Sequence, residues 1–360
     1  MGALKNAGQK LSIFLSGVSM AQKLFFIQNL GVMIKAGIPL MATLKAISEQ
    51  TTNFKLKTAL LDIMANVEKG NNFHESLARH PKIFDNLFIN MVKAGETSGK
   101  LEEALIQVHQ QMKKTHDLFR KVRGALIYPA IVIMAMTGIA IGMMIFVIPN
   151  ITAVFQEMNA TLPLATRILI AISNFMAKNI LWLAPGLLIA IFLFWRLIKW
   201  RIGKYYWQAL LLKLPIVGSI IKKINLARFA RTLSSLLNTA VPIVKAIQTT
   251  GEVLGNVHYQ NALFTSQIKI KQGLTMEEAL ADFKKLFPPV VLQMVAVGEK
   301  TGALDKILNE MAGFYEEEVH QVMNNLPSIL EPVLILIIGG AVGAMAVAII
   351  MPMYSLAEQM

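Results

Sequence analysis

The segment GETSGKL, residues 95–101, occurs again 203 residues later as GEKTGAL, residues 298–304. Four residues stand in the same places in both segments: Gly95, Glu96, Gly99 and Leu101 in the first, and Gly298, Glu299, Gly302 and Leu304 in the second. We predict that each segment is a structural turn. In such a turn, glycine supplies the backbone freedom that ends one helix, the glutamate caps or pairs, and the next helix begins at once.

A phosphate-binding loop is the competing interpretation of the first segment, because two glycines precede Lys100 there. Such a loop has four residues between its glycines and a Ser or Thr after the lysine. Three residues separate Gly95 from Gly99, and Leu101 follows the lysine. The second segment also has Ala303 in the position of the lysine. We therefore expect no nucleotide and no other cofactor on this chain.

The repeat extends over most of the chain without a gap. The same displacement of 203 residues pairs Pro39 with Pro242, Gly70 with Gly273, Pro129 with Pro332 and Pro149 with Pro352. Apolar residues recur at intervals of three and four in both copies, which is typical of amphipathic helices. The sequence thus predicts an all-α fold with two homologous bundles of about six helices each. The first two pairs are predicted to lie at junctions between helices: Pro39, Pro242, Gly70 and Gly273.

The composition indicates an integral membrane protein, since 54% of the 360 residues are hydrophobic and only 16% are charged. The stretches between Pro129 and Pro149 and between Pro332 and Pro352 have nineteen residues each. A helix of that length spans roughly 28 Å, close to the hydrocarbon core of a bilayer. A shorter apolar stretch around Pro185 is the third predicted span.

The distribution of charge predicts the topology. Residues 1–124 contain seventeen Lys and Arg and residues 196–331 contain sixteen, whereas the connection at 150–178 contains two. The positive-inside rule therefore places both large domains and the N-terminus in the cytoplasm and the C-terminus in the periplasm. The net charge of +13 reflects this topology and anionic lipid, so we expect no nucleic-acid partner.

The predicted organisation has eight parts: an N-terminal leader (1–20), cytoplasmic bundle copy 1 (21–124), transmembrane helix 1 (125–148), a short periplasmic connection (149–178), transmembrane helix 2 (179–198), cytoplasmic bundle copy 2 (199–328), transmembrane helix 3 (329–352) and a periplasmic tail (353–360).

No residue pattern in the chain points to catalysis or to a metal site. Cysteine is absent, and the six histidines do not occur at metal-binding spacings. The cores of the predicted spans contain no ionisable residue, which is unlike a pump or a secondary transporter. Two G-x-x-x-G patterns are predicted to pack membrane helices: Gly138 with Gly142, and Gly339 with Gly343.

Two acidic features are candidate contacts for a partner. Glu331 lies just before Pro332 at the predicted membrane boundary, where the first copy has Tyr128. That difference makes Glu331 a candidate contact for a partner protein or for another protomer. The run EEE at residues 316–318 could meet a basic partner, although a solvated helix face is the favoured interpretation.

Three motifs that each occur twice resemble those of the type II secretion system F family. They are LGVMIKAGIP (30–39) with LSSLLNTAVP (233–242), GNNFHESL (70–77) with GLTMEEAL (273–280), and the GETSGKL and GEKTGAL pair. The resemblance covers residues 21–352, and the last pair is its most specific element. Members of this family are the inner-membrane platform proteins of type IV pilus and type II secretion machinery.

The resemblance implies a scaffold without enzymatic activity in a bacterial inner membrane. Its expected partners are a hexameric cytoplasmic assembly ATPase, pilin or pseudopilin subunits, other inner-membrane assembly proteins and further copies of itself. Such a platform would couple the ATPase cycle to extraction of pilin and polymerisation of the filament. The alternative is a small non-enzymatic permease or exporter component.

Overall fold

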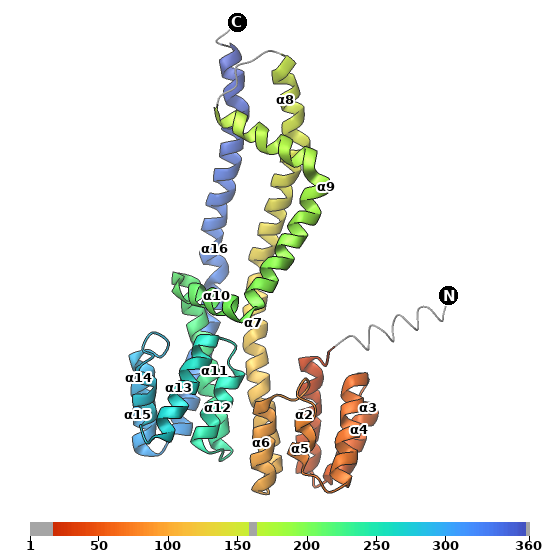
Figure 1. The fold of residues 1–360 in the computed structure, drawn as a ribbon, viewed down its shortest axis with the longest axis vertical. Coiled ribbons are helices and arrows are strands. Elements are labelled where there is room, and N and C mark those ends of the chain that lie inside the picture. The colour runs from red at the N-terminus through yellow and green to blue at the C-terminus, as the bar shows by residue number, and fades with distance from the viewer. Residues whose placement is uncertain (1–16, 158–163, 358–360) are drawn as a thin grey trace, which may run out of the picture. The chain divides into compact units, whose positions relative to one another are not determined.

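The computed structural model describes residues 17–157 and 164–357. All regular secondary structure in those two ranges is helical, which confirms the predicted all-α class (Figure 1). The described residues form two compact units. Unit one contains residues 17–119 and 208–319, and unit two contains residues 120–157, 164–207 and 320–357.

Unit one holds both copies of the repeat. Copy 1 consists of α2 (Met20–Lys35), α3 (Leu40–Gln50), α4 (Phe54–Glu68), α5 (Phe73–Ala78), α6 (Asn86–Thr97) and the beginning of α7 (Leu101–Gly142). Copy 2 consists of α11 (Pro215–Asn238), α12 (Ile243–Val253), α13 (Val257–Lys271), α14 (Met276–Ala281), α15 (Pro289–Thr301) and the beginning of α16 (Leu304–Ala357). From α3 and α12 onward, equivalent helices begin 203 residues apart, so the duplication in the sequence is a duplication of structure.

Each bundle is built around the same buried aromatic pair. In copy 1 the ring centroids of Phe26 and Phe84 lie 5.6 Å apart. In copy 2 the equivalent rings of Phe229 and Phe287 lie 5.2 Å apart. All four side chains are buried, so the first helix of each copy is held against the segment that leads into the fifth.

Helix starts in unit one differ in how they are capped. Thr275 and Glu278 have the Thr-x-x-Glu spacing of a capping box, and they form one at the start of α14. Asn72 and Glu75 stand in the matching places at α5 but form no such box, because Asn72 makes no side-chain cap bond there. A distant carboxylate, described below, binds the first two amide groups of α5.

The turn between the first two helices of each copy requires a left-handed residue. Gly37 supplies it in copy 1, with a φ of 80°, and Ala240 supplies it in copy 2, with a φ of 57°. An alanine in this conformation brings its Cβ close to the following carbonyl oxygen and is strained. Copy 2 therefore carries backbone strain at a position where copy 1 has a glycine.

Unit two consists mostly of long helices. It contains the remainder of α7 and α16, the π-helix η1 (Met143–Val147), α8 (Ile148–Glu157), α9 (Leu164–Lys199) and the start of α10 (Arg201–Lys213). A π-helix disturbs the usual pattern of backbone bonds. The buried hydroxyl of Ser173 on α9 donates to the carbonyl oxygen of Met144 within it.

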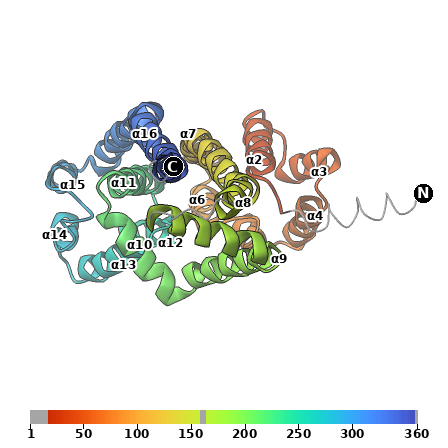
Figure 2. The same cartoon turned by 90° about the horizontal axis from the view of Figure 1, so that it is seen from above.

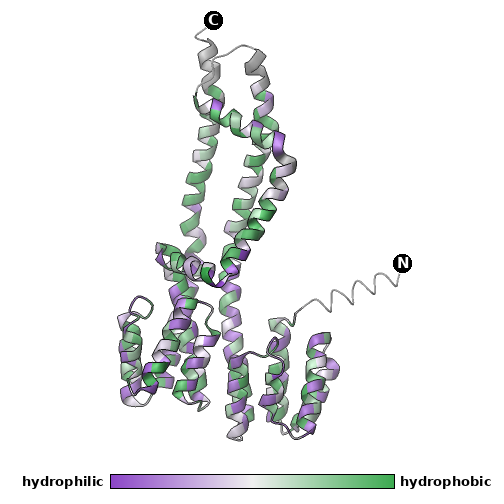
Figure 3. Cartoon of the chain, in the orientation of Figure 1, coloured by the Kyte–Doolittle hydropathy of each residue, from purple (hydrophilic) through white to green (hydrophobic). Residues whose placement is uncertain are grey.

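Two helices in the described residues are long and apolar enough to cross a membrane, within Leu101–Thr152 and Leu304–Ala344. Only 6% and 11% of the residues in their most apolar 18-residue stretches are buried, whereas a core helix of a soluble protein would be mostly buried. Figure 3 shows the corresponding parts of α7 and α16 as predominantly hydrophobic. Two of the three predicted spans are therefore found among the described residues. The segment predicted as a short connection, 149–178, includes most of α8 and the beginning of α9.

Replacing the strained alanine with glycine should stabilise unit one. We expect Ala240→Gly to raise the free energy of unfolding by about 0.5–1 kcal/mol, because glycine adopts the left-handed conformation without the Cβ clash. Gly37→Ala should lower it by about 1 kcal/mol. Thermal unfolding of the full chain in detergent, followed by circular dichroism, measures both. A decrease in stability for Ala240→Gly would contradict the assignment of strain.

Candidate functional site

The two turn glutamates cap short helices that lie elsewhere in their bundles. Glu96, on the last turn of α6, accepts hydrogen bonds from the backbone amides of Phe73 at 2.6 Å and His74 at 3.0 Å. Glu299, on the last turn of α15, accepts two bonds from the backbone amide of Met276, at 3.0 and 2.9 Å. A carboxylate at a helix N-terminus satisfies free amide groups and meets the positive end of the helix dipole.

The environment of Glu96 favours its charged form. Burial raises the pKa of this carboxyl, but hydrogen bonds from the backbone and side chain of His74 and from the amide of Phe73 outweigh that effect and lower the pKa below its usual value. The His74 Nδ1 atom lies 2.6 Å from the carboxylate. Glu96 is therefore held as an ionised structural group.

The first glycine of each turn allows two helices to approach closely. A Cβ atom on Gly95 would lie 2.4 Å from the Cβ of Ala104, and one on Gly298 would lie 2.9 Å from the Cα of Leu304. Neither distance is compatible with a side chain. Each turn therefore brings the helix that it ends into contact with the helix that it starts.

The second glycine of each turn adopts the left-handed conformation, with a φ of 72° at Gly99 and 66° at Gly302. The next amide bonds back across the turn, from Lys100 to the Gly95 carbonyl at 2.7 Å and from Ala303 to the Gly298 carbonyl at 2.9 Å. These bonds close the helix end in the manner of a Schellman motif. Leu101 and Leu304 then begin α7 and α16.

The residues predicted at helix junctions end or precede helices. Gly70 and Gly273 follow α4 and α13 with φ values of 86° and 96°. Pro39 and Pro242 stand at the N-cap positions of α3 and α12, and their carbonyl oxygens accept the first helical bonds. Each helix therefore begins directly after its proline.

A groove of about 610 Å³ lies between the two copies in unit one. Ten residues line it: Asn90, Lys93, Ala94, Thr97 and Ser98 from copy 1, and Thr239, Ala240, Val241, Pro242 and Lys245 from copy 2. The groove thus joins the end of the GETSG turn to the strained junction of the other copy. We refer to it as the inter-repeat groove.

Two lysines and no acidic residue line the inter-repeat groove. Asn90 donates to the Thr249 hydroxyl at 3.0 Å, which ties α6 to α12 next to it. Sequence reasoning did not find this groove, because it forms between segments about 150 residues apart in the chain. The one available signal was Ala240, which stands where the displacement of 203 residues places Gly37.

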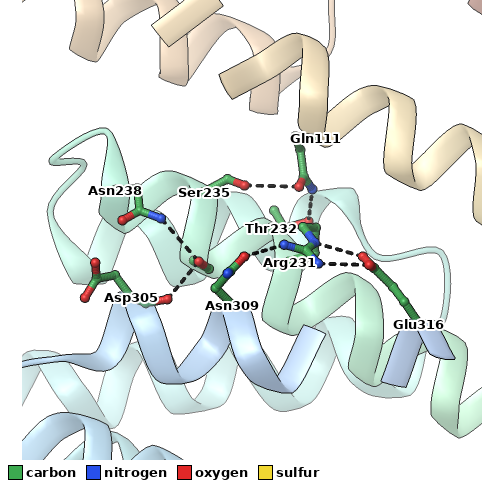
Figure 4. Close-up of polar contacts among 9 residues, drawn as sticks. Gln111, Arg231, Thr232, Ser235, Asn238, Asp305, Asn309 and Glu316 are labelled. Carbon is green, nitrogen blue, oxygen red and sulfur yellow. Dashed lines mark hydrogen bonds and ion pairs between the residues drawn. The ribbon is translucent and has the colours of Figure 1, made fainter. Parts of the chain in front are cut away.

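A partly buried polar network joins α11 to α7 and α16 (Figure 4). The Gln111 amide on α7 donates to the Thr232 hydroxyl at 3.1 Å and accepts from the Ser235 hydroxyl at 3.1 Å. Arg231 binds both oxygens of Glu316 at 2.8 Å and also donates to Asn309. These bonds join copy 1 to α11 of copy 2, and α11 to α16.

The acidic run at 316–318 is engaged within the chain. Glu316 pairs with Arg231, and Glu318 pairs with Lys223. The favoured interpretation of a solvated face is therefore wrong for two of the three glutamates. Their partners are on α11, about 90 residues away, a distance at which helix periodicity gives no information.

The remaining candidate residues lie in unit two. A Cβ atom added to Gly138, Gly142, Gly339 or Gly343 would meet nothing within 4 Å, so these glycines pack against no other described part of the chain. Glu331 is exposed on α16. In the described residues, no group of three or more histidine, aspartate or glutamate side chains could hold a metal ion.

Adding a methyl group to the first turn glycine should destabilise the bundle. We expect Gly95→Ala to lower the free energy of unfolding by about 1–3 kcal/mol, because the new Cβ overlaps Ala104. Gly313→Ala is the matched control, since a Cβ there meets nothing within 4 Å and alanine favours the helix by up to about 1 kcal/mol. Thermal unfolding in detergent compares the two. Equal effects would contradict the close approach at Gly95.

Removing the charge of the turn glutamate should make the free energy of unfolding depend less on pH in the acidic range. We expect Glu96→Gln to cost about 1 kcal/mol at pH 7, since the cap loses its charge. Because the folded pKa is lowered, the stabilisation in the unmodified chain is complete above the unfolded value of about 4.3 and is lost as the pH falls through the folded value. Unfolding measured from pH 7 to pH 3 should show the two proteins converging. A constant difference over that range would contradict this role.

Comparison with known proteins identifies the family. The family model for type II secretion system (T2SS), protein F, matches residues 26–149 and 229–352, one match in each copy. The type IV pilus assembly protein PilC of Thermus thermophilus is 36% identical over 335 residues, which cover 92% of this chain and 81% of that protein. PilC of Myxococcus xanthus is 34% identical over 343 residues, covering 95% and 82%.

A relative that is named for type II secretion is similar over almost the whole chain as well. The type II secretion system protein F of Aeromonas hydrophila is 31% identical over 356 residues, which cover 98% of this chain and 90% of that protein. The family-model matches lie 203 residues apart, as do the equivalent helices of the two bundles. The chain therefore belongs to the type II secretion system protein F family.

Proposed function

We propose that this protein is the inner-membrane platform of a type IV pilus or type II secretion machine. The observation that carries the proposal is the pair of family matches, which together cover both bundles and both long apolar helices. The relatives are named for pilus assembly or for the secretion system, and their similarity extends over nearly the whole chain.

We infer three membrane spans, with α9 supplying the middle one. Large apolar side chains at 187–189 and 191–195 are exposed at consecutive positions, and therefore all around the helix. Asn179 interrupts the helical backbone with φ and ψ of −110° and 15°, at the beginning of the predicted span. Arg196 and Lys199 follow the apolar stretch, as expected at a cytoplasmic boundary.

The platform would act by transmitting movement, without chemistry of its own. α7 and α16 each start at a glutamate turn and continue without a break into an apolar stretch. Force applied to a bundle would thus reach the membrane through a continuous helix. The ATPase would supply the energy, and the membrane helices would guide pilin or pseudopilin out of the bilayer and into the filament.

The inter-repeat groove is our candidate contact for the ATPase. Lys93 and Lys245 give it positive charge, and it has no carboxylate among its lining residues. Such a groove fits an acidic surface, and the strained Ala240 beside it could change conformation when a partner binds. A small permease is the alternative function, and substrate flux through the purified protein in liposomes would favour it.

Reversing the charge of the groove should separate the platform from its ATPase. We expect the unmodified full chain to co-purify with a hexameric ATPase, and Lys93→Glu with Lys245→Glu to reduce the amount recovered by about tenfold or more. Lys57→Glu, at an exposed lysine of α4, is the control for charge alone. Pili or secretion should be lost when the gene is deleted and restored by the control variant.

Two results would count against these proposals. If no ATPase co-purifies and deletion leaves pili and secretion intact, the platform function is wrong. If the ATPase binds equally well to the doubly reversed variant, the function stands and the groove is not the contact.

A further inference from the structure

The two copies in unit one contact each other head to tail. Helices α6 and α7 of copy 1 meet α11 and α12 of copy 2, through Asn90 with Thr249 and through Gln111 with Thr232 and Ser235. The equivalent helices are α15 and α16 on one side and α2 and α3 on the other. Figures 1 and 2 show α15 and the α2–α3 pair at opposite ends of unit one. The contact between the copies therefore uses neither the α15–α16 face of copy 2 nor the α2–α3 face of copy 1.

The unused faces are more apolar than the faces that are buried between the copies. Gln111 on α7 is 2% exposed, whereas Phe314, at the equivalent position of α16, is 57% exposed. Arg228 and Ser235 on α11 face copy 1, and their equivalents on α2 are Phe25 and Val32, which are 51% and 59% exposed. This is the reverse of the usual pattern, in which buried positions are apolar and exposed positions are polar.

The replacements are matched on the two faces. Ser235 donates a hydrogen bond to Gln111 within the chain, and the residues equivalent to this polar pair form the apolar pair Val32 and Phe314. Both members of the pair are thus polar where the copies meet and apolar at the equivalent exposed positions. Val290 and Val297 on α15, both 51% exposed, add apolar surface to the same pair of helices.

We propose that the α15–α16 face of one chain packs on the α2–α3 face of a second copy, repeating between chains the contact that joins copy 1 to copy 2. Phe314 would then lie against Val32, as Gln111 lies against Ser235. A head-to-tail contact adds subunits in one direction until a ring closes. The proposal goes beyond the platform function and rests on the duplicated fold alone.

Cysteine cross-linking of the full chain tests this contact, because the natural sequence contains no cysteine. Two forms with tags of different size, one carrying Val32→Cys and the other Phe314→Cys, are co-expressed and treated in membranes with a short bis-maleimide. We expect a strong heterodimer band and little cross-linking of either variant expressed alone. A symmetric two-fold dimer would instead cross-link one variant with itself.

Two controls make every outcome decisive. Gln111→Cys with Ser235→Cys in one chain should cross-link within the chain, which shows that the bundles are folded and that the reagent spans this geometry. Leu61→Cys, at an apolar residue of α4 that is 50% exposed, replaces Val32→Cys as the matched partner for Phe314→Cys. If the intrachain pair reacts and the heterodimer does not exceed the Leu61 control, the proposed contact does not exist.

Polar replacement provides a second test by the size of the assembly. Phe314→Gln should weaken self-association in detergent by about tenfold or more, since it places an amide opposite Val32 in an apolar contact. Adding Val32→Ser recreates the pair found between the copies and should restore part of the association. An oligomer that is unaffected by either change would overturn the proposal. Both tests are independent of pili, secretion and the ATPase, so failure here leaves the proposed function in place.

Discussion

Each bundle depends on one carboxylate that reaches across it to the start of another helix. The glutamate at the end of α6 or α15 binds free backbone amides of the short helix that precedes it, α5 or α14. Because the same turn begins α7 or α16, a single side chain fixes three helices with respect to one another. A buried amide group left without this partner would be costly, so the carboxylate cannot simply be removed or moved.

Much of this architecture could be predicted from the sequence, because the sequence repeats without a gap at a displacement of 203 residues. A glycine or proline that recurs at a fixed displacement marks a backbone requirement, and the helix period is visible between such residues. The turn glutamates could be predicted only to cap or pair. Their partners lie more than 20 residues away, and nothing local identifies Phe73 or Met276 as those partners.

The parts that sequence reasoning missed are those made by tertiary contact. Asn72 stands at the N-cap position of α5 but makes no side-chain cap bond, and it is Glu96, from a distant turn, that binds the amides of Phe73 and His74. The pairing of Glu316 with Arg231 and the groove beside Ala240 arise where one copy meets the other or where distant helices cross. Local periodicity identifies the apolar face of a single helix, but it does not identify the helix that packs against that face.

The internal symmetry of the chain stops at η1. Met143–Val147 is π-helical, whereas the equivalent residues, 346–350, continue as α-helix. A π-turn encloses one more residue than an α-turn, and one residue corresponds to about 100° of rotation around a helix. Residues after Val147 therefore point in directions different from those of their counterparts on α16. The two long helices align without a gap in sequence, yet beyond this point they present unlike sides to whatever surrounds them.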